Sequence, residues 1–277
     1  MRYVALGDSF TEGVGDPNRH LPNGVRGWAD RVAEGLARAQ PGWEYANLAI
    51  RSKRLRHIVA EQLGPALALE PTLVTVYAGG NDLMDLGTRV GALLAEYEEL
   101  VSRLAGTGAR LLLFTGYEVQ VSAVLKPLRR RNRLYNDGVR AIARRYGAEV
   151  VDYAGFGAYA ERRMWAADRL HMSKAGHKYL AAQVLALLGV DHAIAPRRWD
   201  PLARRSAVGR ASGWTVGQYR WIRDWVVPMF GRKIRGVTMG DALTPRWPEP
   251  VRVPPKGGLR KLAKKRARVA NAGGTPE

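Results

Sequence analysis

Cysteine is absent from the 277 residues of this chain, which excludes disulfide bonds and thiolate metal sites and is compatible with a reducing compartment. No run of about 18 apolar residues occurs, so we expect no membrane-spanning helix. The first apolar run begins at Tyr3, which leaves no room for a signal peptide. We therefore expect a cytoplasmic protein, and its hydrophobic content of 46% is enough for one substantial core.

Three glycine- or serine-dependent signatures are missing as well. Gly13-Val14-Gly15 is not followed by the Lys-Ser or Lys-Thr pair of a phosphate-binding loop. The residues after Gly15 are Asp-Pro-Asn-Arg, which do not open a helix with a third glycine and so exclude the dinucleotide-binding fingerprint. The Gly-x-Ser-x-Gly elbow of the standard α/β-hydrolases is also absent. We therefore expect no nucleotide cofactor and no standard α/β-hydrolase.

Positive charge is distributed unevenly along the chain, whose net charge is +19. Residues 1–190 carry 25 Lys and Arg against 19 Asp and Glu, a net charge of +6. Residues 191–277 carry 19 against 6, a net charge of +13. The first part therefore has the charge of an ordinary soluble domain, and the basic character belongs mainly to the second part.

The first 190 residues alternate between strand-like and helix-like segments. Short apolar or β-branched runs predict strands over residues 3–6, 43–50, 72–77, 110–115 and 148–153. Apolar residues at helical spacing predict helices over residues 26–39, 55–63, 88–104, 134–146 and 173–188. Such alternation is typical of a parallel sheet with helices on both faces. We expect an α/β fold, a three-layer α/β/α sandwich around a central, mostly parallel five-stranded sheet, in a domain of residues 1–190.

Residues 191–277 are expected to form a basic extension, rich in Trp and Arg, that is partly helical and partly irregular. Three tryptophans at helical spacing predict a helix over about 214–227. A proline-rich segment over 245–255 is expected to be extended. From about 256 a basic helix has few apolar anchors, so a disordered tail is the simpler interpretation. Such a tail would bind anionic lipid or nucleic acid only weakly and in a salt-dependent manner.

Polar side chains follow several of the predicted strands. Ser9 comes just after the first strand, and Asn81 comes just after the third. In open α/β sheets, ligands bind beyond the carboxyl ends of the strands. Asp168 precedes His171 by three residues, a spacing that can place a carboxylate against Nδ1 and leave Nε2 facing a serine. The sequence thus offers a serine, a base, a group to orient that base and an amide donor for an oxyanion.

Three motifs occur in a consistent chain order at these places: Gly7-Asp8-Ser9-Phe10, Gly79-Gly80-Asn81-Asp82 and Asp168-Arg169-Leu170-His171. Each motif alone is weak, but the three together are specific. Over roughly residues 1–190 the chain resembles the SGNH hydrolase (GDSL-like lipase/acylhydrolase) superfamily. The resemblance implies a flavodoxin-like fold and hydrolysis of carboxylic esters through an acyl-enzyme intermediate, without a metal or cofactor.

The resemblance also implies a role for each site residue. Ser9 is the nucleophile, His171 the general base and Asp168 the group that orients it. The oxyanion hole is formed by the backbone N–H of Ser9, the Asn81 side chain and the backbone N–H of Ser52, where the family has glycine. The added Cβ of Ser52 could crowd the acyl pocket or shift its loop. The residues that support these loops are Gly7, Asp8, Gly79 and Asp82.

Several alternatives stay open. The substrate is a small-molecule or lipid-like acyl ester, and lysophospholipase-like, thioesterase-like or sugar O-deacetylase activity is an alternative to simple esterase activity. Further alternatives are a non-catalytic binding protein on the same scaffold and a protein that binds anionic surfaces through its basic tail. A metal site of Asp168, His171 and His177 has no recognised ligand spacing, so we expect none. The arginine run over 129–133 could bind an anionic group of the substrate, but a solvated helix start is the simpler interpretation.

Overall fold

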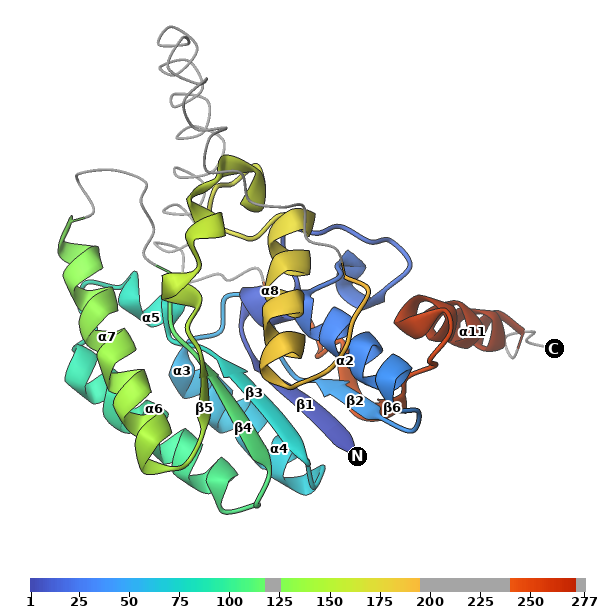
Figure 1. Cartoon of the computed structure of the whole chain (residues 1–277), viewed down its shortest axis with the longest axis horizontal. Coiled ribbons are helices and arrows are strands. Elements are labelled where there is room, and N and C mark those ends of the chain that lie inside the picture. Colours follow the sequence, from blue (N-terminus) through green and yellow to red (C-terminus); the bar gives the residue numbers. More distant parts are fainter. Residues whose placement is uncertain (118–125, 195–239, 273–277) are drawn as a thin grey trace, which may run out of the picture.

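A computed structural model of the chain describes residues 1–117, 126–194 and 240–272 (Figure 1). The helix predicted over about 214–227 lies outside the described residues. Most of residues 116–127, whose sequence shows neither a strand nor a helix pattern, lies outside them as well.

The centre of the fold is a six-stranded sheet with the order β5-β4-β3-β1-β2-β6. The strands are β1 (Arg2–Gly7), β2 (Glu44–Asn47), β3 (Leu73–Tyr77), β4 (Arg110–Phe114), β5 (Glu149–Val151) and β6 (Trp247–Arg252). β1 to β5 run parallel to one another, and β6 is antiparallel to its neighbour β2. The mostly parallel α/β sheet is therefore confirmed. The expected number of five strands is wrong, because the proline-rich segment adds a sixth at the edge.

Helices cover both faces of the sheet and make the expected three layers (Figure 1). They are α1 (Ser9–Glu12), α2 (Trp28–Ala39), α3 (Leu55–Ile58), α4 (Gly64–Ala68), α5 (Gly80–Leu83), α6 (Val90–Ala105), α7 (Lys126–Arg145), α8 (Lys174–Leu187) and α11 (Gly258–Ala272). A π-helical turn over Val59–Leu63 joins α3 to α4, and short 3-10 turns cover Pro22–Gly24, Tyr153–Gly155, Gly157–Ala160 and Arg162–Met164. α7 begins at Lys126, whereas the sequence predicted a start near 134. The predicted start is late because the arginine-rich first turns of α7 carry little apolar periodicity.

Two hydrophobic cores lie on opposite faces of the sheet. Tyr3 and Ala5 of β1 face α2 and α8, whereas Val4 and Leu6 face the layer that contains α3, α6 and α7. This alternation follows from the two-residue period of a strand. Both faces of β1 are buried, as expected for a central strand of a parallel sheet that is covered on both sides. Every residue of β3 is likewise buried.

The C-terminal segment is part of the central sheet. β6 lies at the edge of the sheet and pairs with β2 on one side. Proline has no backbone N–H to donate, and an edge strand tolerates it because an N–H on the unpaired side is not needed for the sheet. Trp247 and Val251 of β6 are both 2% exposed and join the core that also contains α2. The disordered tail expected from about 256 is wrong for the described residues, because Leu259 is fully buried and anchors α11. The six Lys and Arg side chains of α11 are exposed, and their attraction to anionic surfaces stays a prediction.

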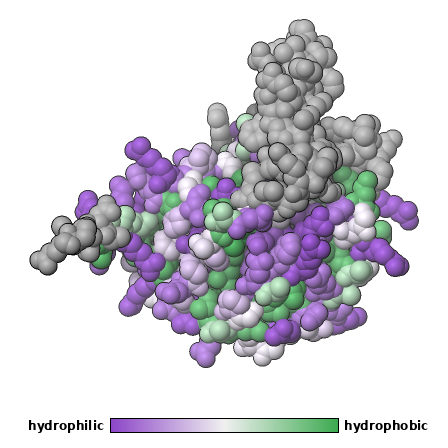
Figure 2. All heavy atoms as spheres, turned by 180° about the vertical axis from the view of Figure 1, so that it is seen from behind, coloured by the Kyte–Doolittle hydropathy of each residue, from purple (hydrophilic) through white to green (hydrophobic). Residues whose placement is uncertain are grey.

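The large exposed hydrophobic side chains of the described structure are Met1, Met84, Leu86, Leu134, Leu187 and Val269. The face seen from behind mixes hydrophobic and hydrophilic residues (Figure 2). Among the described helices, none combines the length and the apolar character that crossing a bilayer requires.

Candidate active site

The turn after β1 places Ser9 at the carboxyl end of the sheet. Gly7 has a φ of +147°, and a Cβ at this position would come within 2.4 Å of the Tyr77 carbonyl oxygen. The side chain of Gln62 accepts a hydrogen bond from Gly7 N and donates one to Gly7 O, both at 2.9 Å. Asp8 then caps α1 by accepting a hydrogen bond from Phe10 N at 3.1 Å. Glycine and these hydrogen bonds therefore fix the backbone that carries the serine.

Ser9, His171 and Asp168 form a continuous hydrogen-bonded series. The Ser9 Oγ lies 2.9 Å from His171 Nε2, and His171 Nδ1 lies 2.6 Å from Asp168 Oδ2. The other carboxylate oxygen of Asp168 accepts hydrogen bonds from the backbone N–H groups of Leu170 and His171, both at 3.0 Å. Arg169 has a φ of +58°, which lets the chain turn tightly between the acid and the histidine. The four-residue motif thus builds a carboxylate–imidazole pair within one turn.

The carboxyl group of Asp168 is held in its charged form. Burial raises its pKa, but the hydrogen bonds and the charge of His171 and the backbone amides outweigh burial and leave the pKa below its ordinary value. A carboxylate in this position can orient an imidazole and stabilise its protonated form.

Asn81 is held beside Ser9 by the turn that follows β3. Gly79 has a φ of +87°, and a Cβ there would come within 2.4 Å of the Tyr135 hydroxyl. The Asn81 Nδ2 donates to Asp8 Oδ2 at 3.1 Å and to the Lys53 carbonyl oxygen at 3.0 Å. An oxyanion could therefore use this amide only by replacing or sharing one of these two acceptors.

The loop around Ser52 is supported from the same side. Ser52 has a φ of +67°, in the left-handed region that favours glycine. Asp82 Oδ2 accepts a hydrogen bond from Leu55 N at 3.0 Å and so ties this loop to α5. Ser52 is not among the described residues that line the cavity beside Ser9, and its proposed contribution to an oxyanion hole stays a prediction.

A cavity opens beside Ser9 and His171. Its described lining is mostly apolar and aromatic: Phe10, Tyr77, Leu83, Met84, Tyr117, Leu128, Trp165 and Leu170. The remaining lining residues are Asp8, Gly80, Asn81, Gly116, Arg129 and Asn132. Such a lining suits the acyl or alcohol part of an organic ester. Sequence analysis did not identify Tyr117, although it follows the carboxyl end of β4 and that position could have pointed to it. Trp165 lies outside any strand end and gave no such signal.

His177 lies apart from this series. It is fully buried, its Nε2 lies 3.1 Å from the Val14 carbonyl oxygen, and burial lowers its pKa to about 3. The neutral imidazole therefore donates its Nε2 proton to that carbonyl. Among the described residues there is no group of three or more His, Cys, Asp or Glu side chains that could hold a metal ion.

Asp8 is the carboxyl group at the site whose pKa is shifted furthest from its ordinary value. Burial raises its pKa to about 7, and the charges of Asp82 and Glu12 add to this effect. The hydrogen bond from Phe10 N and the charge of His171 act in the opposite direction. The cause of the shift is therefore mainly the removal of the carboxylate from water.

We expect the raised pKa of Asp8 to make the free energy of unfolding depend on pH. The folded state holds this proton to higher pH than the unfolded chain, so stability falls as the pH rises from about 4 to about 7. Asp8→Asn removes the titration and should gain stability relative to wild type across this window, then keep a constant difference above it. Urea unfolding at pH values from 4 to 8 measures the difference. The exposed Asp137→Asn variant serves as a control, and a difference for Asp8→Asn that does not change with pH would contradict the assignment.

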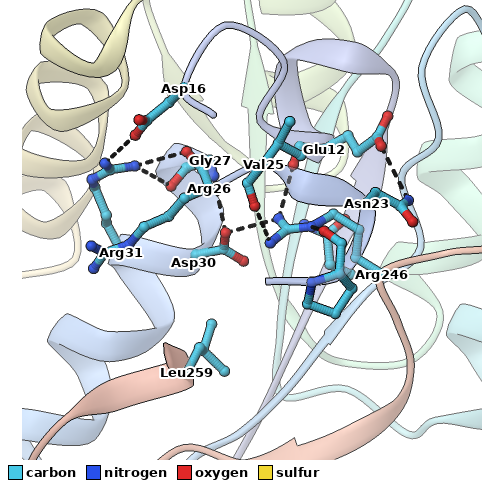
Figure 3. Close-up of polar contacts among 12 residues, drawn as sticks. Glu12, Asp16, Asn23, Val25, Arg26, Gly27, Asp30, Arg31, Arg246 and Leu259 are labelled. Carbon is cyan, nitrogen blue, oxygen red and sulfur yellow. Dashed lines mark hydrogen bonds and ion pairs between the residues drawn. The ribbon is translucent and has the colours of Figure 1, made fainter. Parts of the chain in front are cut away.

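The loop that follows α1 is held by a buried ionic network (Figure 3). The guanidinium of Arg246 donates to Asp30 Oδ2 at 2.8 Å and to the carbonyl oxygens of Glu12, Val25 and Pro22 at 2.8, 2.7 and 3.0 Å. The Arg246 and Asp30 side chains are fully buried. This arginine comes from the segment before β6 and thus ties the C-terminal part of the chain to the turn that carries Ser9.

The Glu12 carboxylate holds a second part of the network. It accepts hydrogen bonds from Arg51 N at 2.7 Å and Arg51 Nη2 at 2.6 Å, and Asn23 Nδ2 donates to it at 3.1 Å. The end of α1 is therefore fixed to the loop that also contains Ser52. No motif in the sequence indicates that Glu12, Arg51 and Arg246 belong to one network.

Solved structures with the same fold are known. The crystal structure of TesA is 22% identical with a TM-score of 0.57, and the alignment covers 68% of this chain and 98% of that chain. Axe2, an acetylxylan esterase from Geobacillus stearothermophilus, is 23% identical with a TM-score of 0.58 and coverages of 71% and 97%. LAE5, an alpha/beta hydrolase enzyme from the metagenome of Lake Arreo in Spain, is 26% identical with a TM-score of 0.57 and coverages of 68% and 94%.

No curated protein is found to match the chain in sequence. The model of the GDSL-like lipase/acylhydrolase family matches residues 5–179, which is well over half of the chain. This range includes all three motifs that the sequence analysis singled out. The chain therefore belongs to the GDSL-like lipase/acylhydrolase family and is an ester hydrolase of the SGNH type.

Proposed function

We propose that this chain is a serine esterase that cleaves carboxylic esters through an acyl-enzyme intermediate. Ser9 is the nucleophile, His171 the general base and Asp168 the residue that orients the base. The observation that carries the proposal is the series Ser9 Oγ–His171 Nε2 at 2.9 Å and His171 Nδ1–Asp168 Oδ2 at 2.6 Å, beside a mostly apolar cavity. Hydrogen-bond contact between nucleophile, base and orienting acid is the arrangement that activates a serine.

The reaction proceeds in two acyl transfers. Ser9 Oγ attacks the ester carbonyl carbon while His171 Nε2 takes the hydroxyl proton, and the carbonyl oxygen becomes an oxyanion. The tetrahedral species collapses with loss of the alcohol, which receives the proton from His171. Water then attacks the acyl-enzyme, again with His171 as base, and releases the acid and free Ser9. Asp168 stays charged throughout and stabilises the imidazolium.

Three donors are proposed for the oxyanion: the backbone N–H groups of Ser9 and Ser52 and the side-chain amide of Asn81. The amide of Asn81 lines the same cavity as Ser9 and is oriented by Asp8 and by the Lys53 carbonyl. These two hydrogen bonds fix the orientation of the amide, and one of its N–H groups would be shared with the oxyanion as the charge develops.

Replacing Asn81 with alanine should lower kcat by about 10²–10³-fold while KM changes little, because the amide acts on the transition state. Steady-state kinetics on a short-chain ester measure the change. Asn18→Ala, outside the described lining of the cavity, is a matched control. A decrease in kcat of less than tenfold for Asn81→Ala would show that the amide is not an oxyanion donor.

The proposal as a whole is tested by turnover of 4-nitrophenyl esters with acyl chains of two to twelve carbons. Hydrolysis by the wild-type protein is expected, and its dependence on chain length reports the acyl group that the cavity accepts. Acetylated sugars, acyl thioesters and lysophospholipids, assayed in parallel, separate sugar O-deacetylase, thioesterase-like and lysophospholipase-like activity from simple esterase activity. Absence of turnover on every substrate would favour a binding protein on the hydrolase scaffold.

A further inference from the structure

The arginine run at the start of α7 contains four arginines with different environments. Arg131 donates to the carbonyl oxygens of Asp85, Leu86 and Thr88 at 2.8, 3.2 and 2.7 Å, so it holds the loop after α5. Arg130 and Arg133 are exposed. Arg129 is half-buried and lines the cavity beside Ser9 and His171. The interpretation of the run as a solvated helix start therefore holds for Arg130 and Arg133 but not for Arg129.

Helical spacing places Arg129 on the face of α7 that meets the end of β4. Asn132 and Asn136, three and seven residues later, share this face. Asn132 Nδ2 donates to the Gly116 carbonyl oxygen at 3.1 Å, and Asn136 exchanges two hydrogen bonds with the Gly116 backbone at 2.7 and 2.8 Å. These contacts fix the rotation of the helix. Arg129, one turn before Asn132, consequently faces the cavity.

The guanidinium of Arg129 has no internal partner among the described residues. Its Nε is buried and makes no hydrogen bond to any of them, and none of them forms an ion pair with it. Buried donors in folded proteins are nearly always satisfied, and a charged donor loses more than a neutral one when it is not. A ligand bound in the cavity can supply the hydrogen-bond acceptor that this cation lacks.

The acidic groups of the cavity are already engaged elsewhere. Asp8, in the described lining, accepts hydrogen bonds from Phe10 N and Asn81 Nδ2. Asp168 lies outside that lining and is paired with His171. The other residues of the described lining include no Asp or Glu. Within the described residues, no acidic group thus remains to satisfy Arg129, and an ester substrate that carries an anion can do so.

We propose that Arg129 binds an anionic oxygen group, a carboxylate or a phosphate, that is part of the ester substrate. The planar guanidinium can form two parallel hydrogen bonds to either group, which fixes the orientation of the substrate as well as its charge. The inference rests on the proposed function, because it assumes that the ester carbonyl is attacked by Ser9 in the same cavity. It narrows the substrate class from acyl esters in general to esters that carry a negative charge.

Two matched pairs of esters test this assignment. Monoethyl succinate carries a carboxylate in its acyl part, and ethyl 4-methylpentanoate replaces that carboxylate with a neutral isopropyl group. The 1-acetyl ester of glycerol 3-phosphate carries a phosphate in its alcohol part, and 1-acetylglycerol lacks it. Release of ethanol or acetate gives kcat/KM for each ester, and the ratio of charged to neutral ester within a pair isolates the recognition of charge.

The ratio is expected to fall by about tenfold to a hundredfold in Arg129→Gln for at least one pair, as expected when a hydrogen-bonded charge loses its partner. Arg129→Lys should keep part of the preference. Arg130→Gln, a neighbouring exposed arginine, should keep all of it. The pair that responds tells whether the substrate anion is a carboxylate or a phosphate.

Two results would overturn the assignment. One is a ratio in Arg129→Gln that stays within twofold of wild type for both pairs. The other is an equal loss on charged and neutral esters, which would indicate a structural role for Arg129.

Failure of the proposed function would look different. If wild-type protein hydrolysed none of the esters, calorimetric titration with succinate and with glycerol 3-phosphate would decide the anion site alone. Binding that is lost in Arg129→Gln and kept in Arg130→Gln supports the site, and absence of binding to wild type contradicts it.

Discussion

Ester hydrolysis is expected to fall by about 10⁵-fold or more in kcat when Ser9 is replaced by alanine, which is the order of loss when the serine of a catalytic triad is removed. The reason is that the variant has no atom to form the acyl-enzyme. Ser9 lies in the first turn of α1, and its Oγ contacts His171 Nε2. Replacing it with alanine should therefore remove this contact and leave the fold unchanged. Residual turnover then comes from binding and from the oxyanion donors alone.

His171→Ala should cause a loss of similar size, and the double variant should lose little more than either single one. This non-additivity follows because the serine and the base act as one unit. Initial rates on a 4-nitrophenyl ester at high protein concentration provide the measurement. Ser102→Ala, at a half-buried position of α6 outside the described lining of the cavity, is a control that should keep full activity. More than about one per cent of wild-type kcat in Ser9→Ala would remove this serine from the mechanism.

The largest expected effect on stability comes from Arg246→Met. The substitution leaves Asp30 as a buried carboxylate without its cationic partner, and it strands the carbonyl oxygens of Glu12, Val25 and Pro22. Breaking a buried ion pair by removing one partner costs about 3–5 kcal/mol of unfolding free energy. Hydrogen bonds from Gly27 N and the Tyr45 hydroxyl to Asp30 remain and place the expected loss at the lower end of this range.

A second substitution separates the charge from the packing of Arg246. Asp30→Asn in the Arg246→Met background removes the uncompensated charge and should recover part of the lost stability. Urea unfolding of the four proteins in the cycle gives the coupling free energy. Arg252→Met, at an exposed arginine that ends β6, is the matched control and should change stability by less than about 0.5 kcal/mol. A loss below about 1 kcal/mol for Arg246→Met would contradict the role assigned to the buried network.

The central sheet was predictable because each inner strand carries a local signal. β1 and β3 are short apolar runs that end in glycine-containing turns, and the helices between them have clear apolar periodicity. The order of these elements places Ser9 and Asn81 at the same end of the sheet. The short spacing between Asp168 and His171 was equally informative, because one turn suffices to bring the two side chains together.

The sixth strand was not predictable in the same way. Its prolines and charged residues lack the alternation of a strand, and its pairing with β2 depends on a contact across about 200 residues of sequence. In the sequence, Arg246 is one of many cations in a basic extension. Only the fold shows that its side chain is buried against Asp30. The orientation of Arg129 depended likewise on where α7 begins and on its contacts with Gly116.

Covalent labelling with a fluorophosphonate tests the central claim most directly, because the reagent reacts with a serine only when a base and an oxyanion site activate it. Intact-mass spectrometry and peptide mapping of the wild-type protein should find one adduct, on Ser9. The adduct should be absent from Ser9→Ala and strongly reduced in His171→Ala. An unlabelled wild-type protein with native circular dichroism, or an adduct on another serine, would contradict the proposal that Ser9 and His171 form the catalytic pair.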